Sequence, residues 1–152
     1  MTHAVGKKNR LHNVIAPIAS QSAGTILVVD DEPGILEVIR RVLKHANYNV
    51  IPTRSGDDTW DILERNRPSI DLVLTDIVMS GPIDGIVLAK KIRQKYQNLS
   101  VLFMTGWLSE RDNCATGMAR DRRLLRKPFS PRELLAFIDS HFGKGELDLE
   151  TV

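Results

Sequence analysis

The sequence predicts an α/β protein: a doubly wound, parallel sheet of five strands with helices on both faces. Short apolar runs alternate along the chain with segments whose apolar residues recur at helical spacing. The apolar runs are continuous, which is typical of strands buried on both faces of a parallel sheet. Crossovers between parallel strands are right-handed, so few topologies remain, and the strand order 2-1-3-4-5 is the natural one.

Two strands and two helices are predicted in the N-terminal half of the chain. The apolar run at residues 25–30 ends in acid and is the first strand. Four apolar residues at helical spacing predict the helix after it: Ile35, Val38, Ile39 and Val42. Residues 49–53 are a weaker strand. Ser55 is expected to cap the second helix, with Asp58 at the third helical position.

The C-terminal half contains the other three predicted strands, at residues 71–75, 99–105 and 124–126. A helical stripe between the first two of them consists of Ile86, Ala89, Ile92 and Tyr96. Residues 108–120 are the weakest predicted helix, because the segment is polar and contains Gly117.

The last helix has the clearest start signal. Ser130 is the expected N-cap, Pro131 suits the first helical position, and Glu133 can reach back to complete a capping box. Three residues supply its apolar face: Leu134, Ile138 and Phe142. The domain is therefore expected at residues 25–142, with flexible tails at residues 1–24 and 143–152.

Composition excludes several classes of protein. The 152 residues fit one domain, and 42% hydrophobic residues are enough for a real core. A net charge of +2 disfavours a DNA-coating protein, and we expect no nucleic-acid partner. The single cysteine, Cys114, rules out an internal disulfide and favours a cytoplasmic location. Because no apolar run approaches about 20 residues, no membrane association is expected.

Polar residues follow the predicted strands where each strand ends. Asp30 and Asp31 follow the first strand, Asp76 the third, Thr105 closes the fourth and Lys127 follows the fifth. These strand ends meet in one crevice of a parallel sheet. Clustered carboxylates repel one another, and Mg²⁺ together with the lysine would balance their charge. The crevice is thus a place where a phosphoryl group can meet a carboxylate.

Four motifs together resemble the receiver domain of two-component response regulators, a flavodoxin-like fold. They are VVDDEP at 28–33, DIVMSGPIDG at 76–85, MTG at 104–106 and KPF at 127–129, in the order and spacing of that family. The resemblance covers residues 25–142 and implies a signalling module of the single-domain type. Such a module is not an enzyme in the usual sense, although it assists its own phosphoryl transfer and slow dephosphorylation.

The resemblance implies a role for each site residue. Asp76 is the phosphoacceptor, taking its phosphoryl group from a phosphohistidine. Asp31 holds Mg²⁺ directly, and Asp30 helps through water or as a second ligand. Asp76 and the backbone carbonyl of Val78 complete the metal ligands.

The remaining implied roles belong to Lys127, Thr105 and Gly106. The lysine pairs with the phosphoryl group, the Thr105 hydroxyl donates to a phosphoryl oxygen, and Gly106 leaves room for the group to enter. The peptide bond between Lys127 and Pro128 is expected to be cis.

The sequence departs from the family pattern at two positions. Leu124 stands where an aromatic switch residue is usual, so the usual swing of a ring cannot operate. Val78 is apolar where many relatives have a polar side chain near the attacking water, which predicts slow dephosphorylation.

The implied partners are a histidine kinase or histidine phosphotransfer protein and a downstream protein, with a homodimer possible. Other interpretations stay open. Asp30 and Asp31 can instead cap the helix near Pro33. The domain can also be a protein-binding module that does not depend on phosphorylation. A phosphohydrolase that forms an aspartyl-phosphate is less favoured, because Val78 lies where an acid would be needed. The arginines at 120, 122, 123 and 126 are a solvated face or a docking surface.

Overall fold

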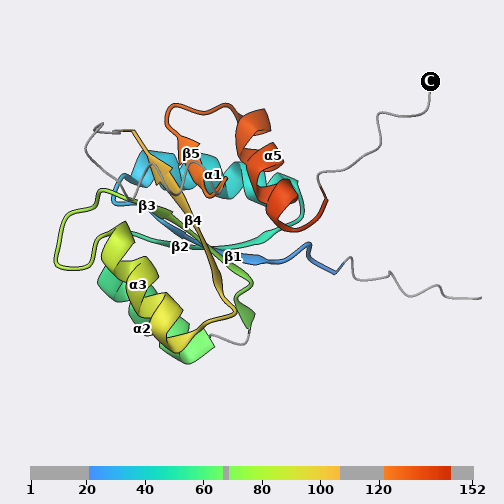
Figure 1. Cartoon of the computed structure of the whole chain (residues 1–152). Coiled ribbons are helices and arrows are strands. Elements are labelled where there is room, and N and C mark those ends of the chain that lie inside the picture. The colour runs from blue at the N-terminus through green and yellow to red at the C-terminus, as the bar shows by residue number, and fades with distance from the viewer. Residues whose placement is uncertain (1–20, 67–68, 107–121, 145–152) are drawn as a thin grey trace, which may run out of the picture.

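The computed structural model describes residues 21–66, 69–106 and 122–144, and its centre is one parallel sheet (Figure 1). The order across the sheet is β2-β1-β3-β4-β5, which confirms the predicted topology. The strands are β1 (Thr25–Val29), β2 (Asn49–Thr53), β3 (Leu72–Asp76), β4 (Ser100–Thr105) and β5 (Leu124–Arg126). Every neighbouring pair is parallel, so the carboxyl ends of all of them lie at one edge.

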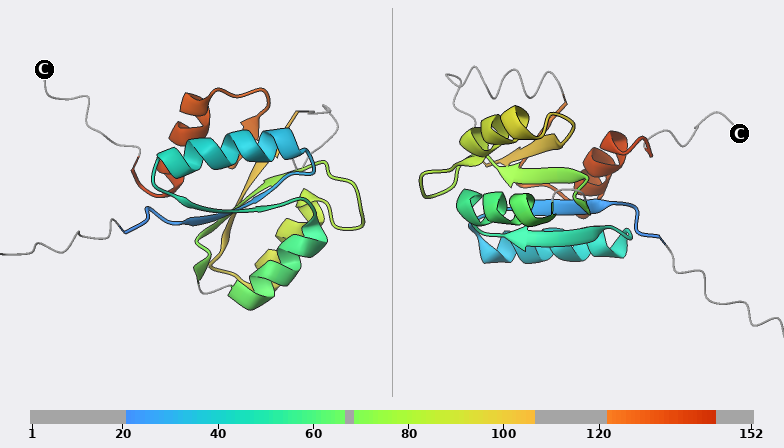
Figure 2. Two further views of the ribbon diagram at one scale, coloured as in Figure 1. Left: turned by 180° about the vertical axis from the view of Figure 1, so that it is seen from behind. Right: turned by 90° about the horizontal axis from the view of Figure 1, so that it is seen from below.

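Helices cover both faces of the sheet. They are α1 (Pro33–His45), α2 (Gly56–Asn66), α3 (Gly85–Lys95) and α5 (Pro131–His141). As Figures 1 and 2 show, α1 and α5 lie on one face, and α2 and α3 lie on the other. Within the described residues, no helix is both long and apolar enough to span a membrane.

Two apolar cores, one on each face, explain why the strands are apolar throughout. Ile26 and Val28 of β1 belong to the core that α1 and α5 cover, whereas Leu27 and Val29 belong to the core under α2 and α3. Successive side chains of a strand point to opposite faces. Each residue of β1 after Thr25 is therefore buried on one face or the other.

Side-chain caps fix where three helices begin. The backbone N–H of Asp58 donates to the Ser55 hydroxyl oxygen, and Ser130 forms a complete capping box with Glu133; both caps were predicted. Asp84 caps α3 by accepting from two backbone N–H groups, which the sequence reading did not anticipate. At the other end of α5, Gly143 has a φ of 70°, a conformation that glycine adopts without strain.

The predicted apolar face of α1 was wrong in detail. Val38 is 54% exposed, and the buried residues are Leu36, Ile39 and Leu43. Ile39 is buried as predicted, and Ile35 and Val42 are half-buried and pack against this core, so the buried stripe is shifted away from Val38. The sheet selects between two neighbouring apolar stripes of the helix, a choice that helical spacing alone does not settle.

A similar shift occurs in α3. Its buried side chains include Leu88, which the predicted stripe omitted, and Ile92, which it contained. Ile86 and Ala89 are only half-buried. The predicted weak helix at 108–120 lies outside the described residues, as do most of the two expected tails.

The described end of the N-terminal segment lies against the turn between α1 and β2. The backbone N–H of Ala23 donates to the carbonyl of Asn47 at 2.8 Å. The Asn47 side-chain amide donates to the carbonyl of Gln21 at 3.1 Å, and that of Asn49 donates to the Ser22 hydroxyl oxygen at 3.0 Å. Residues 21–24, which the sequence reading placed in a flexible tail, are therefore hydrogen-bonded to the domain.

A buried tyrosine ties the start of β2 to α5. The Tyr48 hydroxyl donates to the Asp139 carboxylate at 2.6 Å, and the side chain is only 3% exposed. Burial and the neighbouring carboxylate raise the pKa of the Tyr48 phenol. The Tyr48 ring also packs on Phe142, with 5.3 Å between centroids.

We predict that Tyr48→Phe lowers the free energy of unfolding by about 1–2 kcal/mol, because a buried hydrogen bond to a charged acceptor is lost. Urea unfolding of the single variants and of Tyr48→Phe/Asp139→Ala gives the coupling energy of the pair. If the losses in unfolding free energy of the two single variants simply add in the double variant, the prediction is wrong.

Candidate functional site

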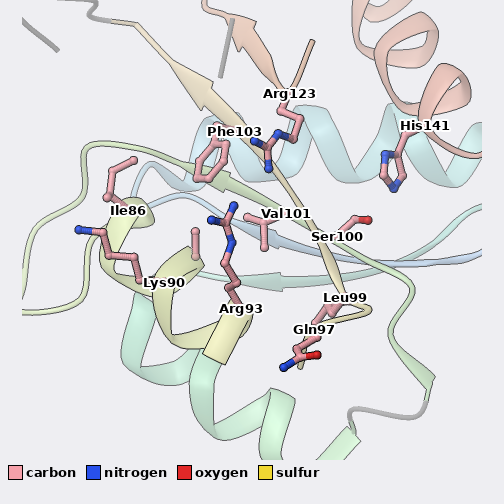
Figure 3. Close-up of a pocket in the computed structure, with 11 residues that line it drawn as sticks. Ile86, Lys90, Arg93, Gln97, Leu99, Ser100, Val101, Phe103, Arg123 and His141 are labelled. Carbon is pink, nitrogen blue, oxygen red and sulfur yellow. The ribbon is translucent and has the colours of Figure 1, made fainter. Parts of the chain in front are cut away.

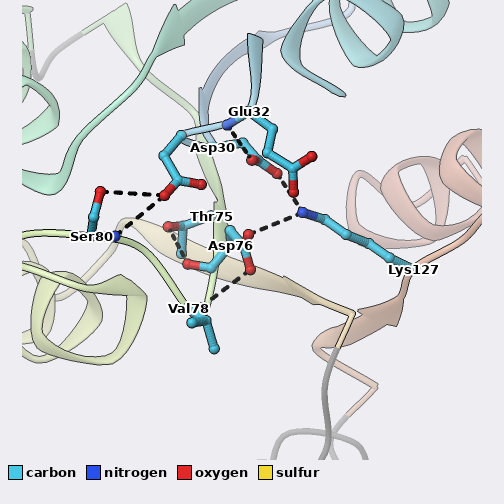
Figure 4. Close-up of polar contacts among 8 residues, drawn as sticks. Asp30, Glu32, Thr75, Asp76, Val78, Ser80 and Lys127 are labelled. Carbon is cyan, nitrogen blue, oxygen red and sulfur yellow. Dashed lines mark hydrogen bonds and ion pairs between the residues drawn. The ribbon is translucent and has the colours of Figure 1, made fainter. Parts of the chain in front are cut away.

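The candidate site lies at the carboxyl edge of the sheet, where three charged side chains converge (Figure 4). Asp30 directly follows β1, Asp76 is the last residue of β3, and Lys127 directly follows β5. Asp30 is fully buried and Asp76 is 6% exposed. The parallel strand order therefore brings together residues that lie far apart in the sequence, as the sequence reading expected of strand ends.

Lys127 bridges the two buried carboxylates. Its Nζ lies 2.6 Å from Asp30 Oδ2 and 3.0 Å from Asp76 Oδ2, as the dashed lines in Figure 4 mark. The lysine side chain is only 13% exposed. The short distances and the exclusion of water strengthen the Coulombic attraction within these pairs, while burial of the charges carries a desolvation cost.

Burial and charge act in opposite directions on these groups. Burial raises the pKa of the Asp76 carboxyl, and the nearby Asp30 adds to this, against the lowering effect of Lys127. Burial alone would lower the pKa of the Lys127 ammonium, but its hydrogen bonds to Asp30 and Asp76 raise it. A raised pKa means that the contribution of Asp76 to stability is present at low pH and is lost as the pH rises through its folded-state pKa.

Asp31 completes an acidic group that fits a divalent cation. One carboxylate oxygen of each of Asp30, Asp31 and Asp76 lies within 4.8 Å of the others. Hard oxygen donors at this separation suit Mg²⁺, which also prefers to keep open positions for water or phosphate. Asp31 is half-buried, and its Oδ2 accepts hydrogen bonds from the backbone N–H and the hydroxyl of Ser80 at 3.3 and 3.4 Å.

The loop after β3 lies beside the Asp76 carboxylate. The backbone N–H of Val78 donates to Asp76 Oδ1 at 3.2 Å, while the Val78 side chain is 63% exposed. The backbone N–H of Gly85 donates to the carbonyl of Ile77 and so closes the loop at the start of α3. A Cβ at Gly85 would collide with the Asp76 carbonyl oxygen. Glycine is therefore required beside the site.

Thr105 and Gly106 lie at the end of β4, next to the lysine. Thr105 is 1% exposed, and its carbonyl accepts a hydrogen bond from the backbone N–H of Lys127 at 2.8 Å. A Cβ added at Gly106 would come within 3.9 Å of the Lys127 Cβ. The peptide bond between Lys127 and Pro128 is cis.

Neither Asp30 nor Asp31 caps α1. The N-cap residue is Glu32, which makes no side-chain capping bond. Asp30 Oδ1 instead accepts from the Glu32 backbone N–H at 2.9 Å, outside the first helical turn. The helix-capping role that the sequence left open for Asp30 and Asp31 is therefore not the one observed.

Sequence reasoning missed Ser80 and Gly85 as neighbours of the site. Ser80 holds Asp31 across 49 positions of sequence, and no local pattern indicates such a contact. Gly85 could have been suspected, because it follows the capping residue Asp84 at the end of the second motif.

We predict that Lys127→Met raises the pKa of the Asp76 carboxyl further, because the only cation bonded to it in the described structure is removed. Carbon-13 NMR titration of the side-chain carboxyl in metal-free buffer measures this. Lys44→Met, which removes an exposed lysine on α1, is the control. An unchanged or lower Asp76 pKa in Lys127→Met would count against the pairing described above.

Comparisons with known proteins agree with this geometry. The family model of the response regulator receiver domain matches residues 26–139. Transcriptional regulatory protein YvrH of Bacillus subtilis is 30% identical over 128 residues, which are 84% of this chain and 52% of that protein. Response regulator GtcR of Aneurinibacillus migulanus is 32% identical over 121 residues, 79% of this chain and 48% of that protein. The chain spans about half the length of these relatives.

Solved structures extend the likeness to the fold. A response regulator receiver domain protein from Clostridium thermocellum has a TM-score of 0.68 at 27% identity, covering 80% of this chain and 95% of that one. A putative response regulator from Chloroflexus aurantiacus has a TM-score of 0.66 at 29% identity, covering 79% and 98%. With the family match and the strand order, these results show that the chain belongs to the response regulator receiver domains.

Proposed function

We propose that this receiver domain accepts a phosphoryl group on Asp76 from a phosphohistidine of a histidine kinase or histidine phosphotransfer protein. The observation that carries the proposal is the convergence of Asp76, Asp30 and Lys127 at the carboxyl edge of the sheet. Output then proceeds through contact with a downstream protein or through onward phosphoryl transfer.

Asp76 is the better acceptor of the two buried acids. Asp30 is fully enclosed, whereas Asp76 keeps some exposure at the mouth of the site. In the transfer, a carboxylate oxygen of Asp76 attacks phosphorus and a P–O bond forms. The P–N bond to the histidine breaks, and its electron pair returns to the imidazole nitrogen. The product is an acyl phosphate on Asp76.

The surrounding residues offset the charge of the incoming group. Lys127, already bonded to Asp76, is placed to pair with the phosphoryl oxygens. Asp30, Asp31, Asp76 and the Val78 carbonyl would hold Mg²⁺, which supplies positive charge opposite the phosphoryl oxygens when bound. The Thr105 hydroxyl donates to a phosphoryl oxygen and thereby biases the end of β4 towards the phosphorylated arrangement.

The proposal predicts that acetyl phosphate with Mg²⁺ adds the mass of one phosphoryl group to the wild-type chain and none to Asp76→Asn. Intact mass spectrometry measures the adduct, which should be labile to base. Asp57→Asn, at an exposed acid of α2, should react like the wild type, and a chelator should stop the reaction. An adduct on Asp76→Asn, or none on the wild type, would refute the proposal. The latter result would favour the phosphorylation-independent binding module.

We also predict that the phosphoryl group on Asp76 is lost slowly, because the exposed Val78 side chain offers no polar atom to orient an attacking water. Val78→Asn should shorten the half-life by roughly ten-fold, about 1.4 kcal/mol of barrier. Loss of the adduct mass over time measures the rate. The matched control is Val87→Asn, at a partly exposed valine of α3, which should leave the half-life unchanged. An equal or longer half-life in Val78→Asn would contradict the prediction.

A further inference from the structure

The three acids of the candidate site are held to different degrees. Both oxygens of Asp30 accept hydrogen bonds, Oδ1 from the Glu32 backbone N–H at 2.9 Å and Oδ2 from Lys127 at 2.6 Å. Both oxygens of Asp76 do so as well, Oδ1 from the Val78 backbone N–H at 3.2 Å and Oδ2 from Lys127 at 3.0 Å. These two carboxylates are also buried, so neither has much freedom to turn.

Asp31 is the least constrained of the three acids. It is half-buried, and among the described residues it pairs with no cation. The hydrogen bonds that the described residues give its carboxylate both come from Ser80, from the backbone N–H at 3.3 Å and from the hydroxyl at 3.4 Å. Both donors meet Oδ2, as the dashed lines from Ser80 in Figure 4 mark. These bonds therefore leave the other oxygen of Asp31 open to a cation.

The loop that carries Ser80 is held by packing on both sides of this residue. Met79 is 7% exposed and belongs to the core under α2 and α3. Ile83 lies so close to the first turn of α2 that a Cβ at Gly56 would collide with the Ile83 carbonyl oxygen. Glycine at position 56 therefore lets the loop approach α2, and these contacts set where Ser80 lies.

We propose that Ser80 is a positioning residue for Asp31. Its two donors orient the Asp31 carboxylate so that the open oxygen faces the cation that the three acids share. The inference rests on the proposed function, in which Asp31 helps to hold Mg²⁺. Side chains that hydrogen-bond to a metal ligand fix its orientation, and removing one of them typically weakens metal binding by roughly 10- to 100-fold.

The physical basis of this role is preorganisation. A half-buried aspartate without hydrogen bonds can occupy several rotamers, and a cation must then order the side chain on binding. In this structure one oxygen of each of Asp30, Asp31 and Asp76 already lies within 4.8 Å of the others. The orientation in which Ser80 holds Asp31 is thus one that a single cation can use, so less conformational entropy is lost when the cation binds.

The surroundings of Ser80 allow this role to be separated from a structural one. Ser80 is exposed and belongs to neither apolar core. Substitutions at such positions usually change the free energy of unfolding little. A loss of metal affinity without a loss of stability would therefore report on Asp31. Threonine at position 80 keeps the hydroxyl, whereas alanine removes it, so the two variants isolate that group.

Mg²⁺ binding to the full-length chain, without phosphodonor, tests the inference. A titration followed by amide NMR signals gives the dissociation constant. Ser80→Ala should raise this constant about ten-fold, the lower end of the usual range because the backbone N–H remains, and Ser80→Thr should bind like the wild type. The control is Ser100→Ala, at the amino end of β4, where Figure 3 shows Ser100 beside a pocket away from the three acids. Its affinity should equal that of the wild type.

A thermodynamic cycle checks that Ser80 acts through Asp31. In an Asp31→Ala background, Ser80→Ala should change the dissociation constant little, because the carboxylate that Ser80 positions is gone. The inference is overturned if Ser80→Ala binds Mg²⁺ as tightly as the wild type, or if Ser80→Thr loses as much affinity as Ser80→Ala. It is also overturned if the loss is equally large in the Asp31→Ala background, or if the wild-type chain binds no Mg²⁺.

Failure of this inference can be told from failure of the proposed function. The mass adduct from acetyl phosphate measures the function, whereas the titration measures metal binding alone. A wild-type chain that takes the adduct while Ser80→Ala keeps full affinity would remove the role of Ser80 and leave Asp76 as the acceptor.

Discussion

The ion pairs of Lys127 with Asp30 and Asp76 are the interaction on which the site depends. Two carboxylates are buried side by side at the ends of β1 and β3, and the neighbouring Asp30 helps to raise the pKa of the Asp76 carboxyl. The lysine comes from 97 and 51 positions further along the chain. The fold must therefore be complete before the two acids have their counter-charge.

The strand order makes this arrangement possible. β1 and β3 are neighbours at the centre of the sheet; Asp30 directly follows β1, and β3 ends in Asp76. β4 lies between β3 and β5, and the hydrogen bond from the Lys127 N–H to the Thr105 carbonyl fixes where the lysine leaves the last strand. The charge of the Asp76 carboxylate costs stability because burial opposes it. The hydrogen bond and ion pair with Lys127 offset part of that cost.

The sequence contained enough information for the strands and for the convergence of the strand ends. Continuous apolar runs identify buried parallel strands, and parallel strands place their last residues at one edge. The capping box at Ser130 is local, so it could be read without the fold. The buried face of α1 could not, because Val38 and Leu36 are both apolar and only the sheet decides which of them faces inwards.

Contacts between residues that lie far apart in the chain could not be predicted from the sequence, for a related reason. Tyr48 and Asp139 are 91 positions apart, and neither lies in a motif. The need for glycine at position 85 arises from its approach to the backbone of Asp76, which depends on how the loop closes over the end of β3. Such features follow from packing between elements that lie far apart in the chain, which local sequence patterns do not encode.

Position 124, at the start of β5, is occupied by leucine and not by an aromatic residue. Leu124 is half-buried and pairs in register with Phe103 of β4. Two residues further along, Thr105 and Arg126 pair at the carboxyl edge of the sheet, beside the candidate site. A leucine lacks the planar ring whose inward and outward positions would be distinct states. Within the described residues, what joins Thr105 to Leu124 is the backbone pairing of β4 with β5.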